Sequence, residues 1–120
     1  MTVLMSRLQR SFESNRGIDV TIVVSGVLKL DPANHDDFAA AALKMAAASN
    51  AEEGVLQYGF YADLETKGSF RVFEEYADEA ALTSHFTSPH MAEFMGVMGG
   101  VGITESSLDQ FKVSEKSKLM

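Results

Sequence analysis

The chain has 120 residues, 46% hydrophobic and 22% charged, with a formal net charge of −7 and no cysteine. This length and composition are typical of one globular domain, and the lack of cysteine excludes disulfides, iron–sulfur clusters and cysteine-ligated zinc. The acidic balance argues against a nucleic-acid partner, because phosphate binding needs a basic surface, and no apolar run approaches the roughly 20 residues of a membrane span.

Residues 1–17 precede the first predicted strand and are expected to form an N-terminal extension to a domain of residues 18–120. They hold three arginines and one glutamate, and apolar side chains recur at every fourth position, at Leu4, Leu8 and Phe12. The extension is therefore either mobile or an amphipathic arm that packs on a partner subunit. It lacks the apolar stretch of a secretory signal, so a cytoplasmic location is expected.

Residues 20–30 alternate with the period of a β-strand. One face has five apolar side chains: Val20, Ile22, Val24, Leu28 and Leu30. Gly26 interrupts that face and predicts a bulge or a close backbone approach. Asp31-Pro32 ends the strand, and Asn34 is the candidate N-cap of an alanine-rich helix. The predicted buried stripe of this helix consists of Phe38, Ala42, Met45 and Ser49.

Two further strands, at residues 55–62 and 70–78, are joined by a polar turn. Period-two alternation places Glu74 on an otherwise apolar face. The side chains expected on that side of the sheet are Leu56, Tyr58, Phe60, Phe70, Val72 and Tyr76. Asp78 can cap the next helix, which Ser88-Pro89 restarts. After a glycine-rich hinge, residues 103–113 form the last strand.

The predicted order β-α-β-β-α-β is the ferredoxin-like α+β pattern, a four-stranded antiparallel sheet with both helices on one face. The opposite face is also apolar, through Val23, Val27, Val55, Tyr61 and Phe73. No helix remains to cover that face, and it is too apolar to stay exposed. We therefore expect a homodimer in which two sheets pack face to face, forming a dimeric α/β barrel.

The segment from Phe70 to Phe94 contains an ordered series of residue types. In sequence it is Phe70-x-Val72-x-Glu74-x-Tyr76-x-Asp78, Ala81-Leu82, His85, Ser88-Pro89-His90 and Phe94. This series resembles the antibiotic biosynthesis monooxygenase (ABM) family, whose members share a dimeric ferredoxin-like α+β barrel. The likeness covers about residues 20–113. The aromatic residue after the glutamate is usually Trp in that family, whereas this chain has Tyr76 there and no Trp.

The resemblance implies a monooxygenase that oxidises a small aromatic or quinol-type substrate without metal, flavin or haem. Such an enzyme deprotonates the substrate, which then reacts with O₂ itself. An isomerase would use the same acid–base groups without oxygen, and a non-catalytic ligand-binding or stress-related dimer would use neither. Haem degradation on this fold relies on the missing Trp.

Glu74 and His85 are the candidate catalytic residues. Desolvation of a carboxyl on an apolar face can tune it for proton transfer, and an imidazole can accept a proton near neutral pH. Alternatively, Glu74 is structural and hydrogen-bonded to a helix residue such as His85. No metal site is expected, because Pro89 breaks the helix between His85 and His90. The candidate substrate-binding residues are Tyr58, Tyr76, Met91, Phe94 and Met95.

Overall fold

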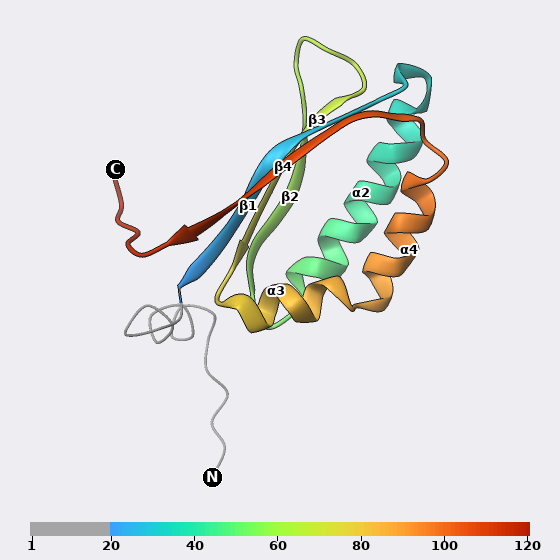
Figure 1. Ribbon diagram of the computed structural model, residues 1–120. Coiled ribbons are helices and arrows are strands. Elements are labelled where there is room, and N and C mark those ends of the chain that lie inside the picture. Colours follow the sequence, from blue (N-terminus) through green and yellow to red (C-terminus); the bar gives the residue numbers. More distant parts are fainter. Residues whose placement is uncertain (1–19) are drawn as a thin grey trace.

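The computed structural model describes residues 20–120 and resolves them into four strands, three α-helices and one 3₁₀ turn (Figure 1). Their order is β1 (Thr21–Leu30), η1 (Pro32–Asn34), α2 (His35–Asn50), β2 (Val55–Ala62), β3 (Ser69–Tyr76), α3 (Glu79–Phe86), α4 (Pro89–Met98) and β4 (Ile103–Val113). Within this part of the chain, no helix is both long enough and apolar enough to cross a bilayer. The expected N-terminal extension, residues 1–17, lies outside the described residues.

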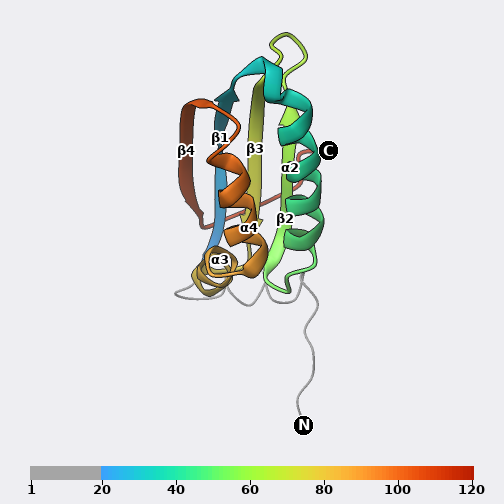
Figure 2. The same cartoon turned by 90° about the vertical axis from the view of Figure 1, so that its right-hand side faces the viewer.

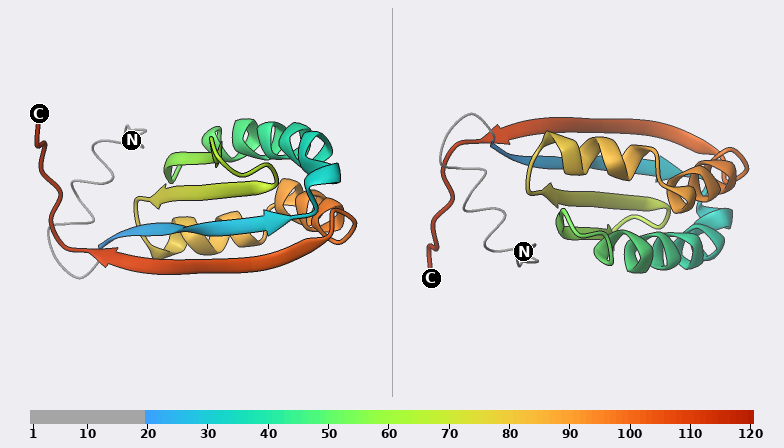
Figure 3. Two further views of the ribbon diagram at one scale, coloured as in Figure 1. Left: turned by 90° about the horizontal axis from the view of Figure 1, so that it is seen from above. Right: turned by 90° about the horizontal axis from the view of Figure 1, so that it is seen from below.

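The strands form one antiparallel sheet in the order β2-β3-β1-β4. All three α-helices lie on the same face of it (Figure 2). β4 runs along β1 at one edge, as both views of Figure 3 show. The predicted ferredoxin-like α+β fold is confirmed, with the second helix divided into α3 and α4 at the predicted Ser88-Pro89 restart.

The core lies between the sheet and the helices, where the predicted periodicities place it. The buried residues of α2 are Phe38, Ala42, Met45 and Ser49, which is the predicted stripe. They share one face because positions three and four apart lie above one another on a helix. On β1, Ile22, Leu28 and Leu30 are buried, so the face assigned to this strand is also confirmed.

Val55 is on the helix side of the sheet, so its predicted position on the outer face was wrong. Its side chain is 0% exposed, and it pairs with Tyr76. The register between β2 and β3 shifts between Val55 and Gln57, which leaves one extra residue, Leu56, on β2. Such an irregularity reverses the alternation on one side of it, and strict period-two counting therefore fails at the start of this strand.

Gly26 marks a close backbone approach, one of its two predicted roles. A Cβ at this position would lie 1.9 Å from the carbonyl oxygen of Ser107 on β4. Asn34 precedes α2 but makes no side-chain capping bond there; its amide donates to the carbonyl of Val101 instead. Asp31 provides the cap one turn earlier, by accepting a hydrogen bond from the Ala33 amide.

The outer face of the sheet keeps apolar side chains at its surface. Tyr61 is 50% exposed and Phe111 of β4, which pairs with Val23, is 51% exposed. Val23, Val27 and Phe73 are partly buried. The outer face therefore includes Phe111 and does not include Val55. It remains the expected dimer contact.

Candidate active site

Three polar side chains of the sheet gather on its helix side. Tyr58 of β2 pairs directly with Glu74 of β3, and Tyr76 follows two residues later on the same face. The Tyr76 hydroxyl donates a hydrogen bond to Oε1 of Glu74 at 2.5 Å. Glu74 is only 7% exposed. The alternation of two strands thus brings together a buried carboxyl and two phenols, as the sequence predicts.

α3 presents His85 to these side chains. The helix begins at the predicted cap, where Asp78 accepts from the Ala81 amide at 2.8 Å. Leu82 and His85, three residues apart, then point inward, and His85 is 1% exposed. Its ring centroid lies 5.1 Å from that of Tyr58 and 5.5 Å from that of Tyr76.

The break between α3 and α4 places a second histidine next to His85. Ser88 accepts a hydrogen bond from the Met91 amide and donates one to the His85 carbonyl, so it fastens the start of α4 to the end of α3. Pro89 occupies the first position of α4, where its missing N–H costs no helical bond. His90 follows in that first turn, and its ring centroid is 6.0 Å from that of His85.

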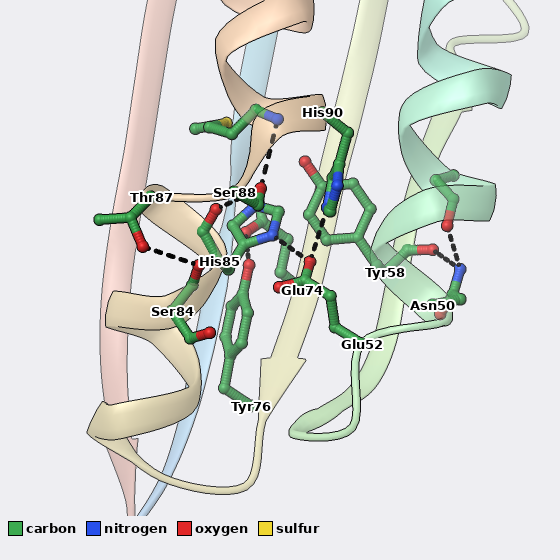
Figure 4. Close-up of polar contacts among 12 residues, drawn as sticks. Asn50, Glu52, Tyr58, Glu74, Tyr76, Ser84, His85, Thr87, Ser88 and His90 are labelled. Carbon is green, nitrogen blue, oxygen red and sulfur yellow. Dashed lines mark hydrogen bonds and ion pairs between the residues drawn. The ribbon is translucent and has the colours of Figure 1, made fainter.

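Glu52 joins the two histidines, as Figure 4 shows. Its Oε2 lies 2.8 Å from Nδ1 of His85 and 2.8 Å from Nε2 of His90. Glu52 belongs to the turn between α2 and β2, which packs against the start of α3. A Cβ on Gly54 in this turn would lie 2.3 Å from the Cβ of Ala81, so only glycine fits there. The turn therefore brings its carboxylate within reach of His85.

The hydrogen bonds of Glu52 determine which ring nitrogens hold protons. A carboxylate oxygen only accepts, so Nδ1 of His85 and Nε2 of His90 are the donors. In neutral His85 the lone pair is then on Nε2, which is buried and has no hydrogen-bond partner among the described residues. His85 therefore presents an unused basic nitrogen beside two tyrosine rings.

Burial governs the acid–base properties of the sheet residues. Desolvation raises the pKa of Glu74, and the Tyr76 hydrogen bond and the nearby His85 oppose that shift. Desolvation, followed by the charge of Glu74, likewise raises the pKa values of Tyr58 and Tyr76 above the usual tyrosine range. Both phenols thus remain O–H donors. The direction of the pKa shift at Glu74 is the one that desolvation on an apolar strand face produces.

The structure separates two residues that the sequence suggested as a pair. The hydrogen bond of Glu74 comes from Tyr76, whereas Nδ1 of His85 bonds to Glu52. Glu52 was missed because it adjoins Glu53 at a helix end, where carboxylates are normally solvated. No spacing in the sequence marks it, since its two histidine contacts span 33 and 38 residues.

The predicted apolar ligand residues are only partly near this cluster. Phe94 is buried and lines a narrow groove of about 80 Å³ between α2 and α4, together with His90. Met91 packs against the core, whereas Met95 is 53% exposed. A wider hollow of about 470 Å³ adjoins Glu52 on the other side. His85 lines neither hollow, so a ligand reaches Nε2 only when a covering side chain moves.

The chain is similar to proteins of one family. Residues 21–97 match the family model described as Antibiotic biosynthesis monooxygenase (ABM). The chain is 31% identical over 107 residues to Uncharacterized protein sll1783 of Synechocystis sp., covering 89% of this chain and 73% of that protein. It is 30% identical over 74 residues to Putative monooxygenase YcnE of Bacillus subtilis, covering 62% of this chain and 78% of YcnE.

Solved structures support the same assignment of the fold. A Caulobacter crescentus protein described as a "putative antibiotic biosynthesis monooxygenase" superposes with a TM-score of 0.74 at 24% identity, covering 87% of this chain and 99% of that one. Rv0793 from Mycobacterium tuberculosis gives 0.73 at 21% identity, covering 82% and 99%. Because the family model spans more than half of the sequence, the chain belongs to the antibiotic biosynthesis monooxygenase family.

Proposed function

We propose that the protein is a cofactor-independent monooxygenase that acts on a small electron-rich phenol or hydroquinone. The observation that supports this most directly is the state of His85. One of its nitrogens is held by the Glu52 carboxylate, while the other is buried without a partner among the described residues, next to two phenol side chains. This is the arrangement of an oriented proton acceptor. Family membership and the monooxygenase name of the relative YcnE support the reaction class.

In this proposal, Nε2 of His85 accepts the phenolic proton of the substrate. The Glu52 carboxylate stabilises the imidazolium that forms and keeps Nδ1 as the protonated nitrogen. Tyr58, which stays protonated, donates a hydrogen bond to the substrate oxygen as it becomes negative, whereas the O–H of Tyr76 is already donated to Glu74. Glu74 holds the Tyr76 hydroxyl and is the second candidate proton acceptor.

The reaction needs O₂ as its only co-reactant. The phenolate supplies an electron pair, through its ring carbon, to O₂, and protonation gives a hydroperoxide at that carbon. Loss of the C–H proton with cleavage of the O–O bond then gives a carbonyl and water. One oxygen atom ends in the quinone and the other in water, and the substrate provides all the electrons, so a flavin or haem is not required.

The test is oxygen consumption by untagged protein with a panel of hydroquinones and polycyclic phenols, after treatment with a chelator and without added cofactor. We expect His85→Gln to lower turnover by roughly 10² to 10⁴, the usual contribution of general acid–base catalysis. Glu52→Gln should lower it as well, whereas Glu53→Gln, which changes the same charge one residue away, should have little effect. Substrate conversion without oxygen uptake would identify an isomerase instead, and unchanged turnover in His85→Gln would reject the proposed role of this residue.

A further inference from the structure

Glu52, His85 and His90 bring together three atoms that can bind a metal ion. These are Oε2 of Glu52, Nδ1 of His85 and Nε2 of His90, and all of them lie within 4.8 Å of one another. The three residues come from separate elements: the α2–β2 turn, the end of α3 and the first turn of α4. The convergence is therefore produced by the tertiary fold and not by helical spacing.

The expectation that no metal binds here rested on the break that Pro89 makes in the helix between the two histidines. It assumed that both ligands must lie on one continuous helix, three or four residues apart. Here the chain changes direction at Ser88, and His90 comes back toward His85 from the start of a new helix. A spacing of five across a break can thus bring two imidazoles to one point.

We propose that Glu52, His85 and His90 form a binding site for a divalent first-row transition ion, for which Zn²⁺ is the best fit. Two imidazoles and one carboxylate are ligands that Zn²⁺ accepts, and three protein ligands leave one position for water. Ligand atoms about 2.0–2.2 Å from a tetrahedral ion lie about 3.3–3.5 Å apart. The two 2.8 Å contacts must therefore widen by about half an ångström. Glu52 and His90 are partly exposed and lie in a turn and a first helical turn, where such a shift is small.

The charges around the three ligands favour a cation, and two hollows in the surface give it access to them. The hollow next to the cluster is lined by Glu52, Glu53 and Asp78 and, among the described residues, by no lysine or arginine. On the other side, His90 also faces the groove between α2 and α4. Behind His85, the Glu74 carboxyl is close enough to interact electrostatically with the imidazole.

An ion at this site and the proton acceptor described above exclude one another, an inference that rests on the proposed function. A metal takes the lone pair of Nδ1, so neutral His85 must then hold its proton on Nε2. That nitrogen can no longer accept a substrate proton, and Glu52 is no longer hydrogen-bonded to Nδ1. The ion therefore acts as an inhibitor of the monooxygenase.

Binding is tested independently of any activity. Untagged, chelator-treated protein is titrated with Zn²⁺ by calorimetry and with Co²⁺ by absorption spectroscopy, which detects a tetrahedral nitrogen–oxygen site through its intense visible bands. We expect one ion per chain, and an affinity at least about 100-fold weaker in Glu52→Gln and in His90→Gln, because each removes a direct ligand. Glu65→Gln and His35→Gln, which alter an exposed acid of the β2–β3 turn and the remaining histidine of the chain, should bind as the wild type does. Circular dichroism confirms that each variant is folded.

Three results separate this proposal from the proposed function. An ion that binds and suppresses oxygen uptake in the wild type supports both. Binding that depends on Glu52 and His90 without any oxygenase activity supports the metal site alone and rejects the monooxygenase. Absence of binding, or equal binding by wild type, Glu52→Gln and His90→Gln, overturns the metal site whether or not the protein consumes oxygen.

Discussion

The Tyr76 hydroxyl donates a hydrogen bond to the Glu74 carboxyl from the same strand, two residues along, at 2.5 Å. Both side chains project from the helix side of β3, so the bond is made beneath the helices. Its effect is to satisfy a buried carboxyl without providing a positive charge. The pKa of Glu74 is accordingly raised, since desolvation outweighs the hydrogen bond.

The raised pKa of Glu74 predicts a specific dependence of stability on pH. The native state binds this proton more tightly than the unfolded chain, so the stabilisation is complete below the unfolded pKa. It is lost as pH rises through the folded pKa. Glu74→Gln keeps the shape and the acceptor for Tyr76, so we expect it to equal or exceed wild-type stability at about pH 8 and to lose that advantage at about pH 4. Urea denaturation at both pH values measures this.

The matched control for that experiment is Glu75→Gln, which removes the same charge from the other face of β3. Its carboxylate pairs with Lys116 at 3.1 Å, so it should show no comparable gain at high pH. A Glu74→Gln protein less stable than wild type at about pH 8 but not at about pH 4 would mean that the native fold holds an ionised Glu74.

The apolar outer face of the sheet predicts a homodimer. Light scattering at micromolar concentration should give about twice the chain mass of 13.0 kDa. Phe111→Asp should shift the protein toward monomer, because burying an unpaired charge in such a contact costs several kcal/mol. Phe73→Asp should do the same or unfold the chain. Leu64→Asp, in the exposed β2–β3 turn, is the matched control and should leave the mass unchanged. A monomeric wild type would contradict the prediction.

Substitution by alanine should change the stability of the fold in opposite directions at two glycines. A Cβ on Gly26 would lie 2.7 Å from the Cα of Leu108, so Gly26→Ala must push β4 away and should destabilise the fold by about 1–3 kcal/mol. Gly96 in α4 has no atom within 4 Å of its Cβ position, and Gly96→Ala should add about 0.5–1 kcal/mol through helix propensity. Urea melts of the two variants test both values; a neutral Gly26→Ala would show that the two strands can separate at no cost.

Deletion of residues 1–17 should leave the domain folded, because they precede β1 and show no strand pattern. The melting temperature of the residue 18–120 fragment should therefore be close to that of the whole chain. A large fall in melting temperature, or loss of the dimer, would instead favour an arm that packs on a partner subunit.

Much of the fold could be predicted because it depends on local patterns. The caps Asp78 and Ser88 and the buried stripe of α2 depend on neighbouring positions in the chain, and all are confirmed. Val55 could not be predicted, since the irregularity beside it depends on how β2 pairs with β3. Alternation determines a face only where the register is continuous.

The same distinction applies to the site. Tyr58, Glu74 and Tyr76 could be placed together because two adjacent strands alternate in phase. Glu52 could not, because its contact with His85 joins a turn to a helix 33 residues away. Side chains brought together by strand pairing leave a pattern in the sequence, whereas those brought together by the packing of a turn on a helix leave none.

The junction at residues 87–88 determines the rotational phase of α4 relative to α3. Ser88 ties the start of α4 to the His85 carbonyl, so the two residues of the junction leave little freedom in where His90 lies. One inserted residue would break this tie and move His90 away from Glu52, while every side chain of the site remained in the sequence. Loops between helices usually tolerate changes in length, but the length of this one determines where His90 lies. Anyone transplanting the cluster to another scaffold must preserve the length of the junction as carefully as the three side chains.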